Sequence, residues 1–186
     1  MLIPLRLSAQ TDEQLMLRAA QGSERAFEEL YNRYARRLQG FFVRRLGDDA
    51  DLAADFMHDT FLRLYAAREK YHEGSSFRAW LYTIAYNLCK NYLRNQLTVI
   101  HDDEKDIPAE ADLEVELDEA ILHDALREAL KSTQEPYAML FSLHYEEELT
   151  IPQIAQIIGL PEGTVKSRLH KTMNIIKQQL KQYENR

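Results

Sequence analysis

The stretch from Thr150 to Leu169 constrains this chain more than any other part of its sequence, because it has the pattern of two short helices joined by a tight turn. Thr150 and Gln153 have the spacing of an N-terminal capping box. Gly159 stands where the first helix must end, at a position that usually needs a left-handed backbone. Pro161 then fixes the start of the second helix. The pattern predicts a helix-turn-helix, a motif whose second helix enters the major groove of DNA.

The second helix of this motif has two chemically different sides. At 100° per residue, one side is expected to face the core: Val165, Leu169, Thr172 and Met173. Hydrogen-bonding groups and cations occupy the other side and the flanks, and we predict that they contact DNA: Thr164, Lys166, Ser167, Arg168, His170 and Lys171. A polar centre between cationic flanks suits base edges in the middle and phosphates on both sides. A solvated amphipathic helix in an ordinary bundle is the alternative interpretation.

Acidic residues dominate the composition but gather in one segment. The chain has 186 residues and a formal net charge of -7. Residues 97–120 hold 10 acidic residues and 1 basic residue, whereas residues 161–186 hold 2 acidic and 6 basic residues. Because local charge decides contact with nucleic acid, the basic C-terminal end suits DNA. The acidic segment cannot bury enough apolar surface to offset its ordering, which predicts a flexible acidic linker over residues 97–118. A polar loop inside one domain is the alternative.

Helical periodicity runs through the chain before this linker. Four helices are predicted in this part of the chain. They cover about residues 12–21, the stretch from a cap at Ser23 to the turn at Gly47, about residues 50–69, and the stretch that begins at a cap at Ser76. A loop is predicted over Tyr71–Ser76. Spacings of three and four mark the buried face of the second helix: Phe27, Leu30, Tyr31, Tyr34, Leu38, Phe41 and Phe42. The same spacings mark the buried face of the fourth helix: Phe77, Leu81, Ile84, Ala85, Leu88 and Tyr92.

The predicted fold class is therefore all-α, with two small helical domains joined by the acidic linker. No part of the sequence has the alternating pattern of a strand. We predict an N-terminal extension over residues 1–11, a first domain over 12–96, the linker over 97–118 and a second domain over 119–186.

Two surfaces of the first domain are unusual. On the third helix, Asp51, Asp55 and Asp59 recur at intervals of four with His58 beside them. The stripe could be plain solvated surface or a docking face for a basic or polar partner. A carboxylate-bridged metal centre would need a second pair like Asp55-x-x-His58, and the sequence has no other Asp-x-x-His, so no metal is predicted.

On the fourth helix, aromatic residues are expected off the core face: Trp80, Tyr82 and Tyr86. Cations and amides lie alongside them: Arg78, Asn87, Lys90, Asn91 and Arg94. Such a mixture suits unstacked bases and their phosphates. The alternative is that these aromatic rings pack internally, and for Trp80 packing is the favoured interpretation because large aromatic residues are buried on average.

Several classes of function are not indicated. The single cysteine, Cys89, excludes an intramolecular disulfide and a cysteine-based zinc site, and its position in a helix predicts a buried thiol. The sequence has no phosphate-cradling glycine loop and no nucleophile–base pair, so we expect neither a cofactor nor enzymatic activity. Without a signal peptide or an apolar run of membrane-spanning length, a soluble cytoplasmic protein is expected.

Three stretches of the chain resemble bacterial sigma factors, and most closely the extracytoplasmic-function (ECF) type of the sigma-70 family. They are Ala53–Tyr65, Phe77–Arg94 and Gly163-Thr-Val-Lys-Ser-Arg-Leu169. The stretches occur in the family's order, and the resemblance covers nearly the whole chain. The last of them also resembles the helix-turn-helices of response regulators.

The resemblance implies partners for each part of the chain. The third helix is similar to the family surface that binds the clamp helices of the largest subunit of core RNA polymerase, which would engage Asp55, His58, Asp59 and Arg63. The second domain would meet the flap of the second-largest subunit. An anti-sigma factor is also an expected partner, and insertion into a membrane is not expected.

The resemblance also implies two promoter contacts. The loop Tyr71–Ser76 and the fourth helix resemble the part that opens the minus-ten element and holds an extruded base, with Asn87 at the base pocket. The residues expected there are His72, Arg78, Tyr82, Tyr86, Asn87, Lys90, Asn91 and Arg94. The helix-turn-helix resembles the domain that reads the minus-thirty-five element. A stand-alone helix-turn-helix regulator and a protein-binding helical adaptor are the alternative functions considered.

Overall fold

The computed structural model describes residues 7–96, 125–130, 133 and 135–184, and these residues form helices and turns with no β-strand. The predicted all-α class is therefore confirmed. The chain divides into two compact units, formed mainly within residues 1–100 and 101–186. The predicted acidic linker, residues 97–118, lies outside the described residues. Among the helices that are described, none combines the length and apolar content that a membrane crossing would need.

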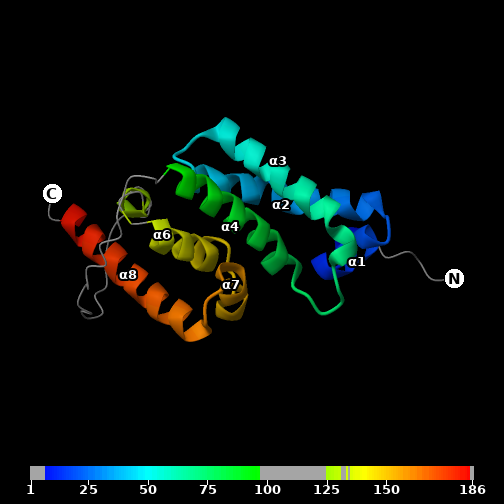
Figure 1. Cartoon of the computed structure of the whole chain (residues 1–186). Coiled ribbons are helices and arrows are strands. Elements are labelled where there is room, and N and C mark those ends of the chain that lie inside the picture. The colour runs from blue at the N-terminus through cyan, green and yellow to red at the C-terminus, as the bar shows by residue number, and fades with distance from the viewer. Residues whose placement is uncertain (1–6, 97–124, 131–132, 134, 185–186) are drawn as a thin grey trace. The chain divides into compact units, whose positions relative to one another are not determined.

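The first unit is built from four α-helices: α1 (Asp12–Ala20), α2 (Glu24–Arg45), α3 (Ala50–Ala66) and α4 (Phe77–Gln96). Two short 3₁₀ turns accompany them, η1 (Leu7–Ala9) and η2 (Arg68–Lys70). As Figure 1 shows, α2 packs against α1 and against α3, and α3 packs against α4.

The third helix ends at Ala66, three residues before the predicted end at Glu69. The Arg68 guanidinium donates a hydrogen bond to the carbonyl of Tyr65 at 2.8 Å. A side chain thus satisfies one of the carbonyls that a helix leaves without a partner at its C-terminus, and the backbone tightens into η2.

Each of these helices starts at a residue whose side chain accepts a hydrogen bond from the amide three positions on. The donor–acceptor pairs are Gln14 to Thr11, Ala26 to Ser23, Leu52 to Asp49 and Ala79 to Ser76, at 2.9–3.4 Å. Ser23 and Ser76 are the caps that the sequence predicts. These local contacts fix where α2 and α4 begin, and with them the position of the connecting loops.

Aromatic and aliphatic side chains from all four helices fill the core of the first unit. The fully buried residues include Leu15, Leu30, Leu38, Phe41, Phe42, Leu64, Phe77, Leu81 and Cys89. The predicted buried thiol at Cys89 is thus confirmed. From the predicted buried face of α2, Phe27 and Tyr31 are only half-buried. Both lie in the N-terminal half of α2, where an open groove runs between α2 and α3.

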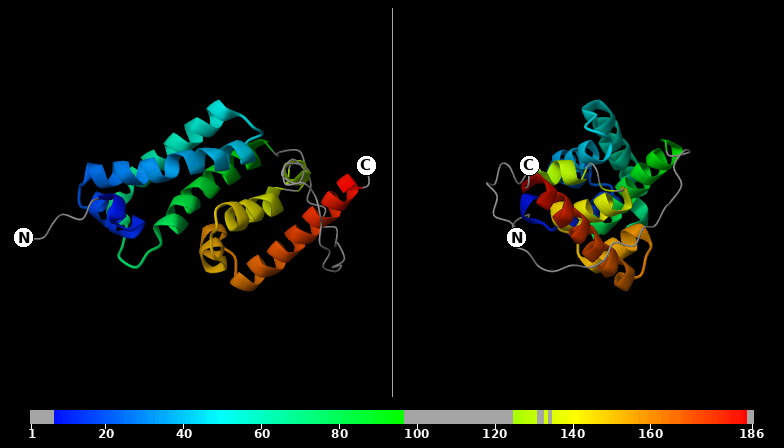
Figure 2. Two further views of the ribbon diagram at one scale, coloured as in Figure 1. Left: turned by 180° about the vertical axis from the view of Figure 1, so that it is seen from behind. Right: turned by 90° about the vertical axis from the view of Figure 1, so that its left-hand side faces the viewer.

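The second unit contains helical residues 125–130 and four further elements: α6 (Glu135–Phe141), the π-helical turn η3 (Ser142–Glu146), α7 (Ile151–Ile158) and α8 (Glu162–Glu184). The long helix α8 runs beside α6, as Figure 2 shows from two sides. A hydrophobic cluster joins them: Ala125, Ala129, Leu130, Phe141, Ile176 and Leu180, with Leu126 and Met173 at its edge.

The predicted helix-turn-helix is present as α7 and α8. The side chain of Gln153 accepts from the amide of Thr150 at 2.9 Å, as a capping box requires. Gly159 has φ 72° and ψ 34°, the left-handed conformation predicted for it. The amides of Gly159 and Leu160 both donate to the carbonyl of Ala155, at 3.0 and 3.2 Å, which closes the C-terminus of α7.

Gly159→Ala is expected to destabilise the protein by about 1–2 kcal/mol, since a Cβ makes the left-handed conformation unfavourable. No heavy atom lies within 4 Å of the position a Cβ would take, so the cost is that of the backbone alone. Gly159→Asn is the matched control, because asparagine tolerates this conformation better. Thermal unfolding followed by circular dichroism should rank wild type above Asn and Asn above Ala. Equal stability of Ala and Asn would contradict this account of the turn.

Candidate functional site

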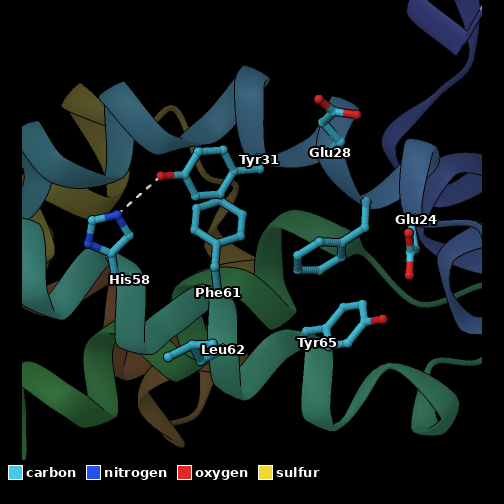
Figure 3. Close-up of a pocket in the computed structure, with 8 residues that line it drawn as sticks. Glu24, Glu28, Tyr31, His58, Phe61, Leu62 and Tyr65 are labelled. Carbon is cyan, nitrogen blue, oxygen red and sulfur yellow. Dashed lines mark hydrogen bonds between the residues drawn. The ribbon is translucent and has the colours of Figure 1, made fainter.

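An open groove of about 620 Å³ lies between α2 and α3 on the first unit (Figure 3). We call it the α2–α3 groove. Its lining residues are Glu24, Phe27, Glu28 and Tyr31 from α2 and His58, Phe61, Leu62 and Tyr65 from α3. The walls are almost entirely apolar, whereas the α2 side carries two carboxylates at its margin. Such a groove suits a partner with an apolar stripe flanked by cations.

Aromatic contacts give the groove its form. Phe27 packs edge-on against Phe61 and Tyr65, with ring centroids 6.1 and 4.9 Å away, and Tyr31 lies 4.7 Å from Phe61. The Arg68 guanidinium covers the Tyr65 ring at 4.1 Å. These contacts hold the rings in place before any partner binds, which lowers the ordering cost of binding.

Leu62 is the most exposed large apolar side chain of the groove, with 69% of its surface accessible, and Tyr65 is 36% exposed. Sequence reasoning missed both residues. The signal was available: Leu62 lies four residues after His58 and Tyr65 seven after it, on a different side of α3 from the buried residues Met57 and Leu64. A large apolar residue outside the core stripe of a helix indicates a binding surface when others gather beside it.

The four residues predicted to bind polymerase lie along one side of α3. His58 lines the groove, and a hydrogen bond of 3.3 Å joins its Nε2 to the hydroxyl of Tyr31, the dashed line in Figure 3. Asp59 pairs with Arg63 at 3.0 Å, and Asp55 is exposed. An exposed pair of this kind adds little stability. In the part of the chain that the structure describes, no group of three His, Cys, Asp or Glu residues could hold a metal ion.

A second candidate surface combines the loop Tyr71–Ser76 with α4. Tyr71 is buried and stacks on Trp80, with centroids 5.4 Å apart and planes at 23°. Its hydroxyl donates to the carbonyl of Ser75 at 2.6 Å. Burial raises the pKa of Tyr71 to about 12, so the phenol keeps its proton and its donor role at neutral pH. Trp80 therefore packs internally, which confirms the favoured interpretation. Its stack with Tyr71 anchors the loop to α4.

Most residues predicted to contact the minus-ten element are accessible. His72, Asn87, Lys90, Asn91 and Arg94 are exposed, and Arg78 and Tyr86 are half-buried. The ammonium group of Lys90 lies 5.8 Å from the centre of the Tyr86 ring. This part of α4 therefore presents an aromatic ring, cations and amides together, a combination that suits unstacked bases and their phosphates.

The prediction for Tyr82 is wrong. Its side chain is 0% exposed and packs edge-on against Phe41, with centroids 5.6 Å apart. Tyr82, Ala85 and Cys89 recur at spacings of three and four and are buried together with Leu81, whereas three residues of the predicted buried face are only half-buried: Ile84, Leu88 and Tyr92. The buried face of α4 is thus displaced from the predicted one, and Tyr82 is a core residue that cannot contact DNA.

The first turns of α8 present the predicted minus-thirty-five residues as expected from the helical spacing. Val165, Leu169 and Thr172 are buried. Outside them, Lys166, Ser167, Arg168 and His170 are exposed, and Thr164 and Lys171 are half-buried. The hydroxyl of Ser167 donates to the carbonyl of Thr164 at 3.0 Å, and the ammonium of Lys171 lies 5.4 Å from the centre of the Tyr137 ring in α6.

Comparisons with known proteins match both units. Residues 30–97 match the family model for sigma-70 region 2, and residues 123–174 match that for sigma-70, region 4. The RNA polymerase sigma-H factor of Pseudomonas aeruginosa is 30% identical, over 91% of this chain and 94% of that protein. The ECF RNA polymerase sigma-E factor of Escherichia coli is 31% identical, over 89% and 92%. The sigma factor RpoE of Bartonella quintana, solved with the anti-sigma factor NepR, has a similar fold: the TM-score is 0.63 at 23% identity, over 83% of this chain and 96% of that chain.

Proposed function

This chain belongs to the sigma-70 family as a sigma factor of the ECF type, and we propose that it docks on core RNA polymerase through the α2–α3 groove. A sigma factor binds core polymerase and directs it to promoters, and it is not itself an enzyme. The family matches give no support to the stand-alone regulator or to the protein-binding adaptor that were considered from the sequence.

The observation that carries the docking proposal is the exposed aromatic groove beside the predicted polymerase-binding residues. The clamp helices of the polymerase largest subunit are the partner that the family resemblance implies. Leu62 and the aromatic rings would lose water against an apolar stripe of that partner. Asp55, Asp59, Glu24 and Glu28 would meet cations around it and exclude partners of the wrong charge.

Two DNA contacts are proposed on separate domains. The loop Tyr71–Ser76 and the exposed side of α4, around Asn87, would hold unstacked bases of the minus-ten element. The first turns of α8 would enter the major groove at the minus-thirty-five element, while the second domain meets the flap of the second-largest subunit. Capture of extruded bases offsets an unpairing cost of a few kcal/mol, so opening needs no ATP.

Docking on polymerase would combine these two modest contacts. Each DNA surface is small, and the acidic segment over residues 97–118 repels DNA phosphates. Fixing both domains on one partner turns the second contact into an intramolecular event and raises affinity without a new interaction. We also propose that an anti-sigma factor binds this chain, because the similar sigma factor of Bartonella quintana was solved in complex with one.

Run-off transcription with core polymerase on a library of genomic DNA tests the proposal. Promoter-specific transcripts should require both core polymerase and this chain, and the recovered sequences should share two elements. Gel shifts with the recovered fragments should show tight binding only when core polymerase is present. Tight, sequence-specific binding by the free chain at physiological salt would favour a stand-alone regulator instead.

A further inference from the structure

Among the residues that the structure describes, one predicted minus-thirty-five contact lies against an aromatic ring from another helix of the same unit. This residue is Lys171. Its ammonium lies 5.4 Å from the centre of the Tyr137 ring, inside the range of a cation–π interaction. Both side chains are half-buried. The contact therefore sits at the surface, where the cation can still reach a ligand.

The distance between the two helices is fixed by the core beneath this contact. Tyr137 lies one turn before Phe141 on α6, and Phe141 packs in the same cluster as Ile176 and Leu180 of α8. Met173, two residues after Lys171, packs at the edge of that cluster. The part of α6 that carries Tyr137 is thus held beside α8 by packing of the core, without any contribution from DNA.

A lysine side chain loses much conformational freedom when it binds a phosphate, because its four-carbon stem has many rotamers. A ring that already holds the ammonium restricts the stem in the free protein, so less freedom remains to be lost on binding. Tyrosine can do this without neutralising the charge, whereas a carboxylate in the same place would compete with the phosphate.

We propose that Tyr137 is a positioning residue for promoter recognition: its ring face holds the Lys171 ammonium in place for a backbone phosphate at the minus-thirty-five element. The inference rests on the proposed contact between Lys171 and DNA and adds to it a residue outside the helix-turn-helix. The ring face is the active feature, so the hydroxyl of Tyr137 is dispensable.

The test is a double-mutant cycle on the full-length chain bound to core polymerase. The probe is a closed duplex promoter fragment recovered by run-off transcription, and filter binding gives the affinity. Tyr137→Leu should weaken binding about two- to fivefold, the range of an exposed cation–π contact. Tyr137→Phe should bind like wild type. In a Lys171→Ala background, Tyr137→Leu should have no further effect, whereas in a Lys166→Ala background its effect should persist.

Each other outcome overturns the proposal. An equal loss from Tyr137→Leu in the presence and absence of Lys171 would mean that the ring only supports the fold. A loss on Tyr137→Phe would assign the role to the hydroxyl, and tighter binding by Tyr137→Leu would mean that the ring withholds Lys171 from DNA. Full affinity of Lys171→Ala would instead remove the underlying DNA contact. Thermal unfolding of each variant separates a folding defect from a binding defect.

Discussion

Replacing Leu62 by aspartate is expected to weaken binding of core RNA polymerase by about 30-fold or more, the loss expected at an interface hot spot of 2 kcal/mol or above. Leu62 is 69% exposed in the free chain and lines the α2–α3 groove (Figure 3). A carboxylate there would have to lose its water against the apolar surface of the partner. The neighbouring Phe61 ring offers it neither a hydrogen bond nor an opposite charge. The free chain keeps its stability, since the side chain is outside the core.

Asn32→Asp is the matched control for this experiment. It introduces the same carboxylate at an exposed position of α2 that does not line the groove. Co-purification with core polymerase and a titration of fluorescently labelled chain should both separate the two variants. Circular dichroism spectra should be the same for both. If Leu62→Asp bound core polymerase as tightly as Asn32→Asp does, the groove would not be the docking surface.

The helix-turn-helix could be predicted from sequence because its determinants are local. A capping box, a left-handed glycine and a proline lie within a few residues of one another, and each acts through the backbone that carries it. The caps at Ser23 and Ser76 were predictable for the same reason. Gly159 adopts the conformation that its place in the pattern requires.

The α2–α3 groove could not be predicted in the same way. Phe27 and Tyr31 fit the periodicity of a buried face, and the sequence does not reveal that α3 leaves them half-covered. Tyr82 shows the opposite error. Its neighbours in sequence, Leu81 and Thr83, give no sign that α2 places Phe41 against it. Burial of a side chain at the edge of a helix face depends on the width of the packing surface, which is set by the neighbouring helix.

The two promoter contacts should fail at different steps when they are altered. Asn87→Ala is expected to slow promoter opening about 10- to 100-fold while recruitment changes little, because a base gains from a protein pocket only after it leaves the duplex. Arg168→Ala is expected to weaken recruitment to all promoter sequences and to reduce its dependence on salt, because a phosphate partner exists in closed DNA. Both residues are exposed, so neither change should disturb a core.

A promoter fragment with a melted minus-ten element separates the two expectations. The melted template removes the unpairing cost that Asn87 would help to offset, so it should rescue the Asn87→Ala variant. It leaves the minus-thirty-five duplex unchanged, so it should not rescue Arg168→Ala. Permanganate footprinting of unpaired thymines reports opening, and filter binding reports recruitment.

The neighbouring Tyr86→Ala variant shows whether the aromatic ring of α4 acts with Asn87. Tyr86 is half-buried, and Lys90 lies over its ring, so its loss could disturb α4 itself. A lowered melting temperature of the free chain would reveal that effect, and the footprint would then be interpreted from Asn87→Ala alone. Equal rescue of Asn87→Ala and Arg168→Ala by the melted template would contradict the assignment of opening to α4 and recruitment to α8. Rescue of the first alone would assign opening to α4 and recruitment of duplex DNA to α8.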